Sequence, residues 1–283
     1  TGRGMPEIGV PMEHQRVLIT GGSGAVGSML RPRLARPGRT LRLLDVADPP
    51  ALDGTGPEET VQGSVTDPAV LAEACRDVQA VVHLGGKANE APLEDIVAVN
   101  VRGTSLLLEA VRAAGVPRVV LASSNHAVGF TPRPESGDLP ADVPDRPDTF
   151  YGWSKVAMEA AGRLYADRFG MDVLCLRIGT CATEPYDVRS LATWLSPDDM
   201  GRLAEACLTV PNPGFRVVWG VSRNTRRWWS LAEGEAIGYS PEDDAEVFAG
   251  RLIPEGHVPD FAGDPVLNRV GGDFCDTPLG EPA

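Results

Sequence analysis

The stretch TGGSGAVG, residues 20–27, follows the apolar run RVLIT at 16–20 and opens a segment with helix-like character. Gly21, Gly24 and Gly27 permit a tight turn, a close approach of a pyrophosphate to backbone amides, and close packing of helix on strand. A second apolar run, 41–45, ends in Asp45, about where an acid binds the ribose hydroxyls of an adenine dinucleotide. A carboxylate there repels a 2′-phosphate, so the pattern predicts NAD rather than NADP. The alternative is a glycine-rich turn without a ligand.

Further apolar runs alternate with helix-like segments up to about residue 180. This rhythm is typical of a parallel sheet with helices on both faces. We therefore predict an α/β fold: a doubly wound parallel sheet (Rossmann) with a small C-terminal substrate-binding lobe, and a ligand site beyond the carboxyl ends of the strands. The expected strands are 16–20, 41–45, 80–84, 118–123 and 172–179, with a strand-like run at 215–222. The expected divisions are a loose N-terminal leader at 1–15, the NAD-binding domain at 16–180, the lobe at 181–265 and a C-terminal extension at 266–283.

The charge and composition limit the partners of this chain. A net charge of −13 and a pI of about 4.8 argue against nucleic acid and against an anionic membrane surface. No apolar stretch approaches the length of a membrane span, and the first 15 residues contain no apolar secretion signal. The five cysteines form no CxxC pair and the four histidines have no metal-ligand spacing. We expect a cytoplasmic protein with reduced cysteines and no metal.

The segment TFYGWSKVAM, 149–158, places a phenol and an ammonium four residues apart. On a helix, Tyr151 and Lys155 share one face. At about 5 Å and an effective dielectric of about 20, their attraction is roughly 3 kcal/mol, which predicts a tyrosine pKa lowered by about two units. Tyr151 is then a candidate general base. The alternative is a pair of surface residues with no shared role.

A third candidate catalytic group follows the strand predicted at 118–123. Ser124 lies where the sheet should present its ligand site, and Asn125 and His126 come directly after it. Ser124 is suited to bind a substrate hydroxyl that loses its proton. The alternative for all three is a turn in which they bind their own backbone.

Together these motifs resemble the extended short-chain dehydrogenases/reductases, the NAD-dependent epimerase/dehydratase family. The resemblance rests, in order along residues 16–180, on TGGSGAVG, Asp45, VVHLGG (81–86), NVRGT (100–104), ASS (122–124) and YGWSK (151–155). It implies that Ser124, Tyr151 and Lys155 are catalytic, and that Asn100 supports Lys155 through a water. The NAD contacts that it implies are Gly21, Ser23, Gly24, Ala25, Val26, Gly27, Asp45, Ser64, Val65, Leu84, Gly85, Asn100, Lys155 and Ile178.

Over nearly the whole chain the sequence is similar to one group within that family, the uronate dehydrogenases. The likeness extends through RIGTCATEP (177–185), LATWLSPDD (191–199), VVWGVS (217–222) and RRWWS (226–230). It implies NAD-dependent oxidation of the anomeric carbon of galacturonate or glucuronate to an aldarolactone. It also implies that Arg189 binds the uronate carboxylate, a role that suits a planar guanidinium. The implied substrate contacts are Lys87, Ser124, Asn125, His126, Tyr151, Thr180 and Arg189.

Several positions keep alternatives open. Arg177 competes with Arg189, but its place at a strand end indicates a structural anchor, and Trp228 and Trp229 are expected to pack the lobe. Ser64 stands where relatives often have an aspartate that binds adenine, and Lys87 either approaches the substrate carboxylate or points to water.

The other functions considered are a nucleotide-sugar epimerase or dehydratase and a non-catalytic NAD-sensing protein. The resemblance also allows a homo-oligomer formed through the helices after NVRGT and YGWSK.

Overall fold

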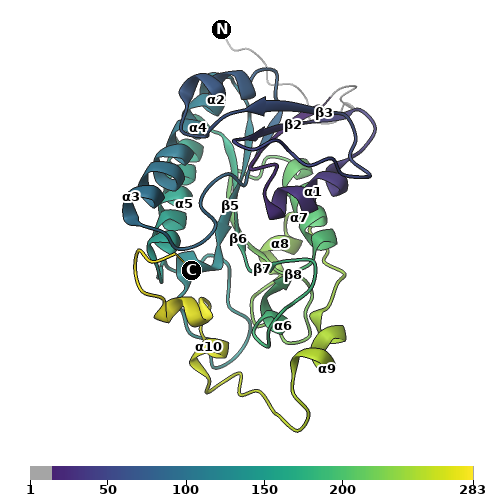
Figure 1. The fold of residues 1–283 in the computed structure, drawn as a ribbon, viewed down its shortest axis with the longest axis vertical. Helices are drawn as coiled ribbons and strands as arrows, with labels where there is room; N and C mark the ends of the chain where they lie inside the picture. The colour runs from purple at the N-terminus through teal and green to yellow at the C-terminus, as the bar shows by residue number, and fades with distance from the viewer. Residues whose placement is uncertain (1–14, 283) are drawn as a thin grey trace.

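The structure, a computed structural model, describes residues 15–282 of the 283. Seven parallel strands form the main sheet in the order β3-β2-β1-β4-β5-β6-β9 (Figure 1). This confirms the predicted doubly wound α/β fold. The sequence of the leader predicted at 1–15 lies outside the described residues except for Gln15, where β1 begins. The strands are β1 Gln15–Thr20, β2 Arg39–Asp45, β3 Glu58–Gln62, β4 Ala80–His83, β5 Arg118–Ser124, β6 Asp172–Ile178 and β9 Phe215–Gly220.

The strand order reverses between β1 and β4, and this is where an open α/β sheet binds its ligand. The glycine-rich loop follows β1 directly, and β4 ends at His83 beside it. The sheet therefore places residues 20–27 and the segment after β4 on the two sides of one crevice.

Helices cover both faces of the sheet (Figure 1). Helices α1 and α7 lie on one face, and α2, α4 and α5 lie on the other. Because strand side chains alternate in direction, neighbouring residues of one strand enter different cores: Val17 packs with α1 and α7, and Leu18 packs with α2, α4 and α5. The helices on the two faces are α1 Ala25–Leu34, α7 Pro197–Thr209, α2 Pro68–Ala74, α4 Gly103–Ala113 and α5 Phe150–Phe169.

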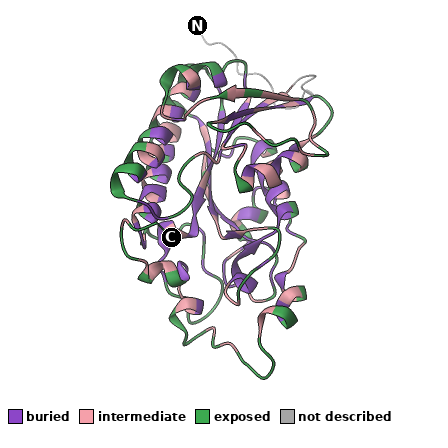
Figure 2. Cartoon of the chain, in the orientation of Figure 1, coloured by how far each residue is buried: buried purple, intermediate pink, exposed green. Residues whose placement is uncertain are grey.

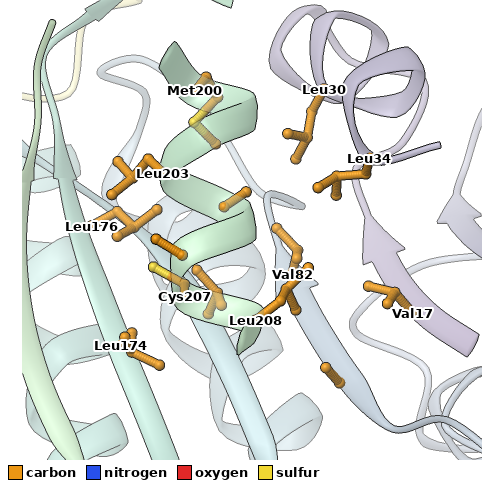
Figure 3. Packing of buried hydrophobic residues seen from close by; sticks show 14 of the residues in the cluster. Val17, Leu30, Leu34, Val82, Leu174, Leu176, Met200, Leu203, Cys207 and Leu208 are labelled. Atoms are coloured by element: carbon orange, nitrogen blue, oxygen red, sulfur yellow. The ribbon is translucent and has the colours of Figure 1, made fainter. Parts of the chain in front are cut away.

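The two cores are continuous apolar layers. Figure 2 shows buried residues concentrated along the strands and on the inner sides of the helices, with exposed residues on the outer sides. In the first core, Leu203 of α7 packs near Leu176 of β6, and Leu30 and Leu34 of α1 lie on the side of Val17 and Val82 (Figure 3). Full burial of each such side chain stabilises the fold by roughly 1.5–3 kcal/mol.

The part of the chain after residue 180 contributes a strand and a helix to the main sheet and its cover. Helix α7 packs on α1, and β9 pairs with β6 in parallel from Val173↔Phe215 to Ile178↔Gly220. The rest consists of short elements: β7 Thr180–Cys181, β8 Trp194–Leu195, α6 Ser190–Thr193, α8 Ala232–Glu235, η3 Ala245–Phe248, α9 Ala249–Leu252, α10 Pro265–Asn268 and η4 Gly272–Asp276. Trp228 and Trp229 are buried there, and Trp229 stacks on Trp219 with ring centroids 4.4 Å apart, which confirms their packing role.

Three short helices complete the fold near the carboxyl ends of β4 and β5: α3 Leu93–Ile96, the π-helix Val97–Arg102 and the 3-10 helix Asn125–Val128. Along residues 15–282, no helix combines the length and the apolar character needed to cross a bilayer.

Arg177 is a structural anchor, as its position at the end of β6 indicated. Its guanidinium binds Glu159 of α5 through two hydrogen bonds of 3.0 and 2.7 Å. It also donates to the carbonyl oxygens of Ala141 and Val143 at 2.9 and 3.0 Å. Arg177 therefore joins the sheet, helix α5 and the segment that leads to the catalytic helix.

Replacing Arg177 with methionine should lower the free energy of unfolding by about 3–5 kcal/mol, because Glu159 keeps its buried carboxylate and loses the partner for it. Urea unfolding followed by fluorescence measures the change. Arg163→Met, which breaks the exposed Arg163–Asp167 pair and the contact of the guanidinium with the Phe215 ring, should cost no more than about 1 kcal/mol. Equal losses in the two variants would contradict the anchoring role of Arg177.

Candidate active site

The glycine-rich loop is built to receive a phosphate group. Gly24 is the N-cap residue of α1 and offers no side-chain cap, so the first amides of the helix are free for an anion. A Cβ atom on Gly27 would lie 2.4 Å from the carbonyl oxygen of Gly21, so only glycine permits this close turn. The carboxylate of Asp45 accepts a hydrogen bond of 2.9 Å from the backbone amide of Ser23. The loop and the acid at the end of β2 therefore lie together, as a bound dinucleotide requires.

The other residues predicted to contact NAD extend from this loop. Val26, Leu84, Lys155 and Ile178 line a cavity next to it. Gly85 follows β4 and donates its amide to the Thr20 hydroxyl at 3.0 Å. The remaining predicted contacts, Gly21, Ser23, Gly24, Ala25, Gly27, Asp45, Ser64, Val65 and Asn100, lie outside the cavity lining.

Two of these residues have side chains engaged elsewhere. The Ser64 hydroxyl lies 2.8 Å from that of Thr66 and stabilises its own turn. Asn100, in the π-helix, donates to the Lys87 carbonyl and to the Ser154 hydroxyl, and accepts from the Lys87 amide at 2.7 Å. Asn100 therefore fixes the loop after β4 on helix α5.

The cavity has a volume of about 360 Å³ and lies at the carboxyl ends of β4, β5 and β6. All seven residues predicted to bind substrate line it. Ser124, Asn125 and His126 come from the end of β5 and the 3-10 helix after it, Tyr151 comes from α5, and Arg189 directly precedes α6. The full set is Lys87, Ser124, Asn125, His126, Tyr151, Thr180 and Arg189.

Ser124, Tyr151 and Lys155 converge because helix α5 packs closely on the segment after β5. A Cβ atom on Gly152 would lie 2.3 Å from the His126 carbonyl oxygen, so the glycine in YGWSK permits this approach. The Ser124 hydroxyl accepts from the His126 amide at 3.2 Å and faces the same cavity as the Tyr151 phenol, and Lys155 donates to the Ala122 carbonyl at 2.7 Å. The lysine ammonium lies 5.3 Å from the centre of the tyrosine ring.

The prediction that the pKa of Tyr151 is lowered is wrong. Burial raises the pKa of Tyr151 to about 12, against the opposing effect of the Ser124 hydrogen bond. Burial also lowers the pKa of Lys155 to about 8, although the nearby Glu159 raises it. Desolvation is the largest cause of the Tyr151 shift, and the negative charge of Asp148 raises this pKa further. At neutral pH Tyr151 is a phenol, and Lys155 is mostly charged.

His126 is held by a buried carboxylate that the sequence did not single out. Its Nδ1 atom lies 2.7 Å from Oδ2 of Asp148, whose side chain is inaccessible to solvent. The imidazole also stacks on Phe274, with ring centroids 4.1 Å apart. With Nδ1 donating to Asp148, Nε2 is the acceptor atom of a neutral imidazole.

Arg189 has an unusual environment. Its Nη2 atom donates to the Val270 carbonyl, and its buried Nε atom has no hydrogen-bond partner among residues 15–282. Across that same range, no carboxylate forms an ion pair with it. Burial lowers its pKa, and the nearby Asp187 and Asp273 act in the opposite direction. Arg189 therefore supplies unpaired hydrogen-bond donors and a positive charge at the cavity.

Thr180 and Lys87 complete the predicted set. The Thr180 hydroxyl lies 2.9 Å from that of Thr193. Lys87 is half exposed and lies 3.7 Å from a carboxylate oxygen of Asp95, so it lines the cavity and also faces water.

The C-terminal segment contributes to the site in a way that the sequence did not reveal. Asp273 and Phe274 line the cavity, and the Val270 carbonyl accepts hydrogen bonds from Asn125 and Arg189. The segment shows no helical or strand periodicity, so nothing local indicates these contacts. Asp148 was missed for a related reason, since it ends a proline-rich stretch that reads as a loop.

The nucleotide-binding loop, the Tyr–Lys pair on α5 and the parallel sheet together define the class of this protein. The chain belongs to the NAD dependent epimerase/dehydratase family, whose model matches residues 17–195. Among characterised proteins, it is 41% identical to the uronate dehydrogenase of Agrobacterium fabrum strain C58, over 94% of this chain and 98% of that protein. It is 37% identical to the uronate dehydrogenase of Pseudomonas putida, over 92% of this chain and 95% of that protein.

Solved structures give the same result. A uronate dehydrogenase from Agrobacterium tumefaciens superposes with a TM-score of 0.84 at 40% identity, covering 94% of this chain and 98% of that one. A tyrosine-to-alanine mutant of that enzyme complexed with NAD superposes with a TM-score of 0.83 over the same shares of the two chains.

Proposed function

We propose that this protein is an NAD-dependent uronate dehydrogenase, which oxidises the anomeric carbon of D-galacturonate or D-glucuronate and gives the aldarolactone. The observation that carries the proposal is the cavity itself. Arg189, which forms no ion pair within residues 15–282, lines the same cavity as Ser124 and Tyr151. A sugar acid whose carboxylate binds Arg189 can present a hydroxyl to Tyr151 at the other side. Uronate dehydrogenases at 37–41% identity over nearly the whole chain support the same reaction.

NAD fits the residues that would hold it. The free amides at the start of α1 suit a pyrophosphate, and Asp45 suits the adenosine ribose. Lys155 and Ile178 line the cavity where this crevice meets the substrate space. NAD, when bound, accepts the hydride that leaves the anomeric carbon.

Tyr151 takes the proton of the anomeric hydroxyl as that carbon is oxidised. It can do so only as the phenolate, and burial disfavours this form in the chain alone. Ser124 donates a hydrogen bond to the phenolate or to the substrate oxygen as charge moves between them. The buried ammonium of Lys155 favours negative charge on Tyr151 through the low-dielectric interior.

Arg189 binds the uronate carboxylate, and Asn125, His126 and Thr180 bind sugar hydroxyls. Val270 holds Asn125 and Arg189 through one carbonyl oxygen, which keeps the two groups at a fixed separation. Asp148 keeps the imidazole of His126 oriented so that Nε2 accepts a hydroxyl proton. These contacts orient the anomeric hydroxyl towards Tyr151.

Two further predictions concern the protein in the cell. The five free cysteines favour a reducing, cytoplasmic location. A homo-oligomer through α4 and α5 is the arrangement that the family resemblance suggests.

The test is to mix the protein with NAD and, separately, galacturonate, glucuronate, galactose or glucose, and to follow NADH absorbance. Turnover confined to the two uronates is the expected result. Turnover of the neutral sugars at equal rates would show that Arg189 does not select substrates with a carboxylate. Silence with all four sugars, combined with NAD that remains bound through purification, would replace the proposal with a nucleotide-sugar epimerase.

A further inference from the structure

Glu90 is a buried carboxyl group that the reaction described above does not use. It lies in the loop after β4, with 2% of its surface exposed. Its two oxygens accept hydrogen bonds from the backbone amides of Tyr151 at 2.8 Å, Phe150 at 3.3 Å and Gly280 at 2.8 Å. Glu90 does not line the cavity, although Lys87, Ala88 and Asn89 just before it do. Any effect of Glu90 on catalysis is therefore indirect.

The first partner of Glu90 is the start of the catalytic helix. The opening amides of a helix have no partner within it and must be satisfied from outside. At the start of α5, Thr149 accepts from the Gly152 amide at 3.0 Å, and Glu90 accepts from the two amides before it. A negative charge is also favoured at this end of the helix. Glu90 therefore fixes the backbone of Tyr151 itself.

The second partner is the C-terminal segment. Gly280 lies 190 residues from Glu90 in sequence, and its amide donates to the same carboxyl group at 2.8 Å. Upstream, the segment pairs with the chain after β5: the Val270 amide donates to Thr131 at 3.0 Å, and that of Gly271 donates to Gly129 at 2.8 Å. The Val270 carbonyl in turn holds Asn125 and Arg189. The segment between these two attachments carries Asp273 and Phe274 of the cavity wall.

We propose that Glu90 is a positioning residue, which ties the C-terminal segment to the start of α5 so that Asp273 and Phe274 keep their place in the cavity relative to Tyr151. The inference rests on the proposed function, because this cavity is the one that would bind the uronate. Glu90 connects two parts of the site that no other hydrogen bond among residues 15–282 joins directly: the backbone of the catalytic tyrosine and residues 279–282. Loss of the Glu90 hydrogen bonds should make residues 270–276 more mobile and leave the NAD-binding crevice unchanged.

The test uses two changes, separately and combined. Glu90→Gln preserves the shape of the side chain but replaces one acceptor oxygen with an amide group that cannot accept. Ending the chain after Pro278 removes the Gly280 amide and leaves Glu90 on the helix, and it disturbs no fully buried side chain. We expect the truncation to raise KM for galacturonate by about 10-fold with kcat and NAD affinity little changed, because it loosens only the wall. Glu90→Gln should show the same rise in KM and also a lower kcat.

The combined variant is decisive. If Glu90 acts through the C-terminal segment, adding the truncation to Glu90→Gln should change KM no further, since the connection is already lost. Hydrogen exchange of the amides at 270–276 should speed up in both single variants while exchange along β1 and α1 stays the same. Additive effects on KM, or unchanged exchange at 270–276 in Glu90→Gln, would overturn the proposal.

The exchange measurement separates this proposal from the proposed function. Faster exchange at 270–276 in a protein that does not oxidise uronates would support the attachment and refute the substrate. Normal uronate turnover in a protein whose 270–276 amides exchange slowly in every variant would support the substrate and refute the attachment.

Discussion

Replacing Tyr151 with phenylalanine is expected to lower kcat for uronate oxidation by about 1000-fold, which is within the range that general acid–base groups contribute. The change removes one oxygen atom from a buried ring that is already packed with Ala91 and Ile96. The fold and the NAD crevice should therefore survive, and NAD affinity measured by fluorescence should stay near that of the parent protein. Steady-state NADH formation gives kcat.

The control is Tyr165→Phe, on the same helix but at the surface, where the phenol binds Glu109. Its kcat should match that of the parent protein. Residual turnover above about a tenth of the parent value in Tyr151→Phe would show that another group takes the proton.

The pH dependence of turnover tests the same role of Tyr151. Burial raises the pKa of the Tyr151 phenol to about 12, and the base in the oxidation is the phenolate. The population of phenolate rises with pH, so kcat for uronate oxidation should increase as the pH is raised from 6 to 8, where Lys155 still carries charge. The pH dependence of kcat reports ionisations in the complex with substrate, whereas that of kcat/KM reports those of the free protein. A profile that falls over this range would contradict the role of the phenolate.

The second large effect concerns Arg189. Arg189→Met should lower kcat/KM for galacturonate by roughly 100-fold, since two charge-assisted hydrogen bonds contribute about 3 kcal/mol. Methionine fills much of the same space but cannot bind a carboxylate. The ratio of kcat/KM for galacturonate to that for galactose measures the contribution of the charge, because both sugars experience any change in the shape of the cavity.

Arg189→Lys serves as the matched comparison. It keeps the charge but loses the planar pair of donors and the contact with Val270, so it should recover only part of the lost ratio. An unchanged ratio in Arg189→Met would mean that the carboxylate binds elsewhere, and Lys87, which also lines the cavity, would be the next residue to change.

The parts of the fold that the sequence predicts are those with local signals. Continuous apolar runs identified five strands, and the observed bounds differ by one or two residues. The edge strand β3, EETVQ, was missed because it is only partly buried and carries no apolar run. The run at 215–222 was seen as strand-like, but only the structure reveals that it pairs with β6 in the main sheet.

The features of the site also divide into those that the sequence predicts locally and those that depend on the folded chain. Tyr151 and Lys155 are four residues apart on one helix, so their proximity can be read from the sequence. The pKa of Tyr151 cannot, because desolvation depends on what the rest of the chain packs around the phenol, and here it reverses the expected direction of the shift. Glu90, Asp148 and Val270 act through partners 22 to 190 residues away, which local patterns do not specify.

Galacturonate carrying deuterium at its anomeric carbon tests the central claim most directly. The protein is incubated with this substrate and NAD, and the NADH and the sugar are analysed by mass spectrometry. Oxidation at the anomeric carbon predicts that the deuterium is transferred to NADH and that the sugar becomes a lactone. Unlabelled NADH, or deuterium retained on a sugar that has changed configuration at another carbon, would contradict the account.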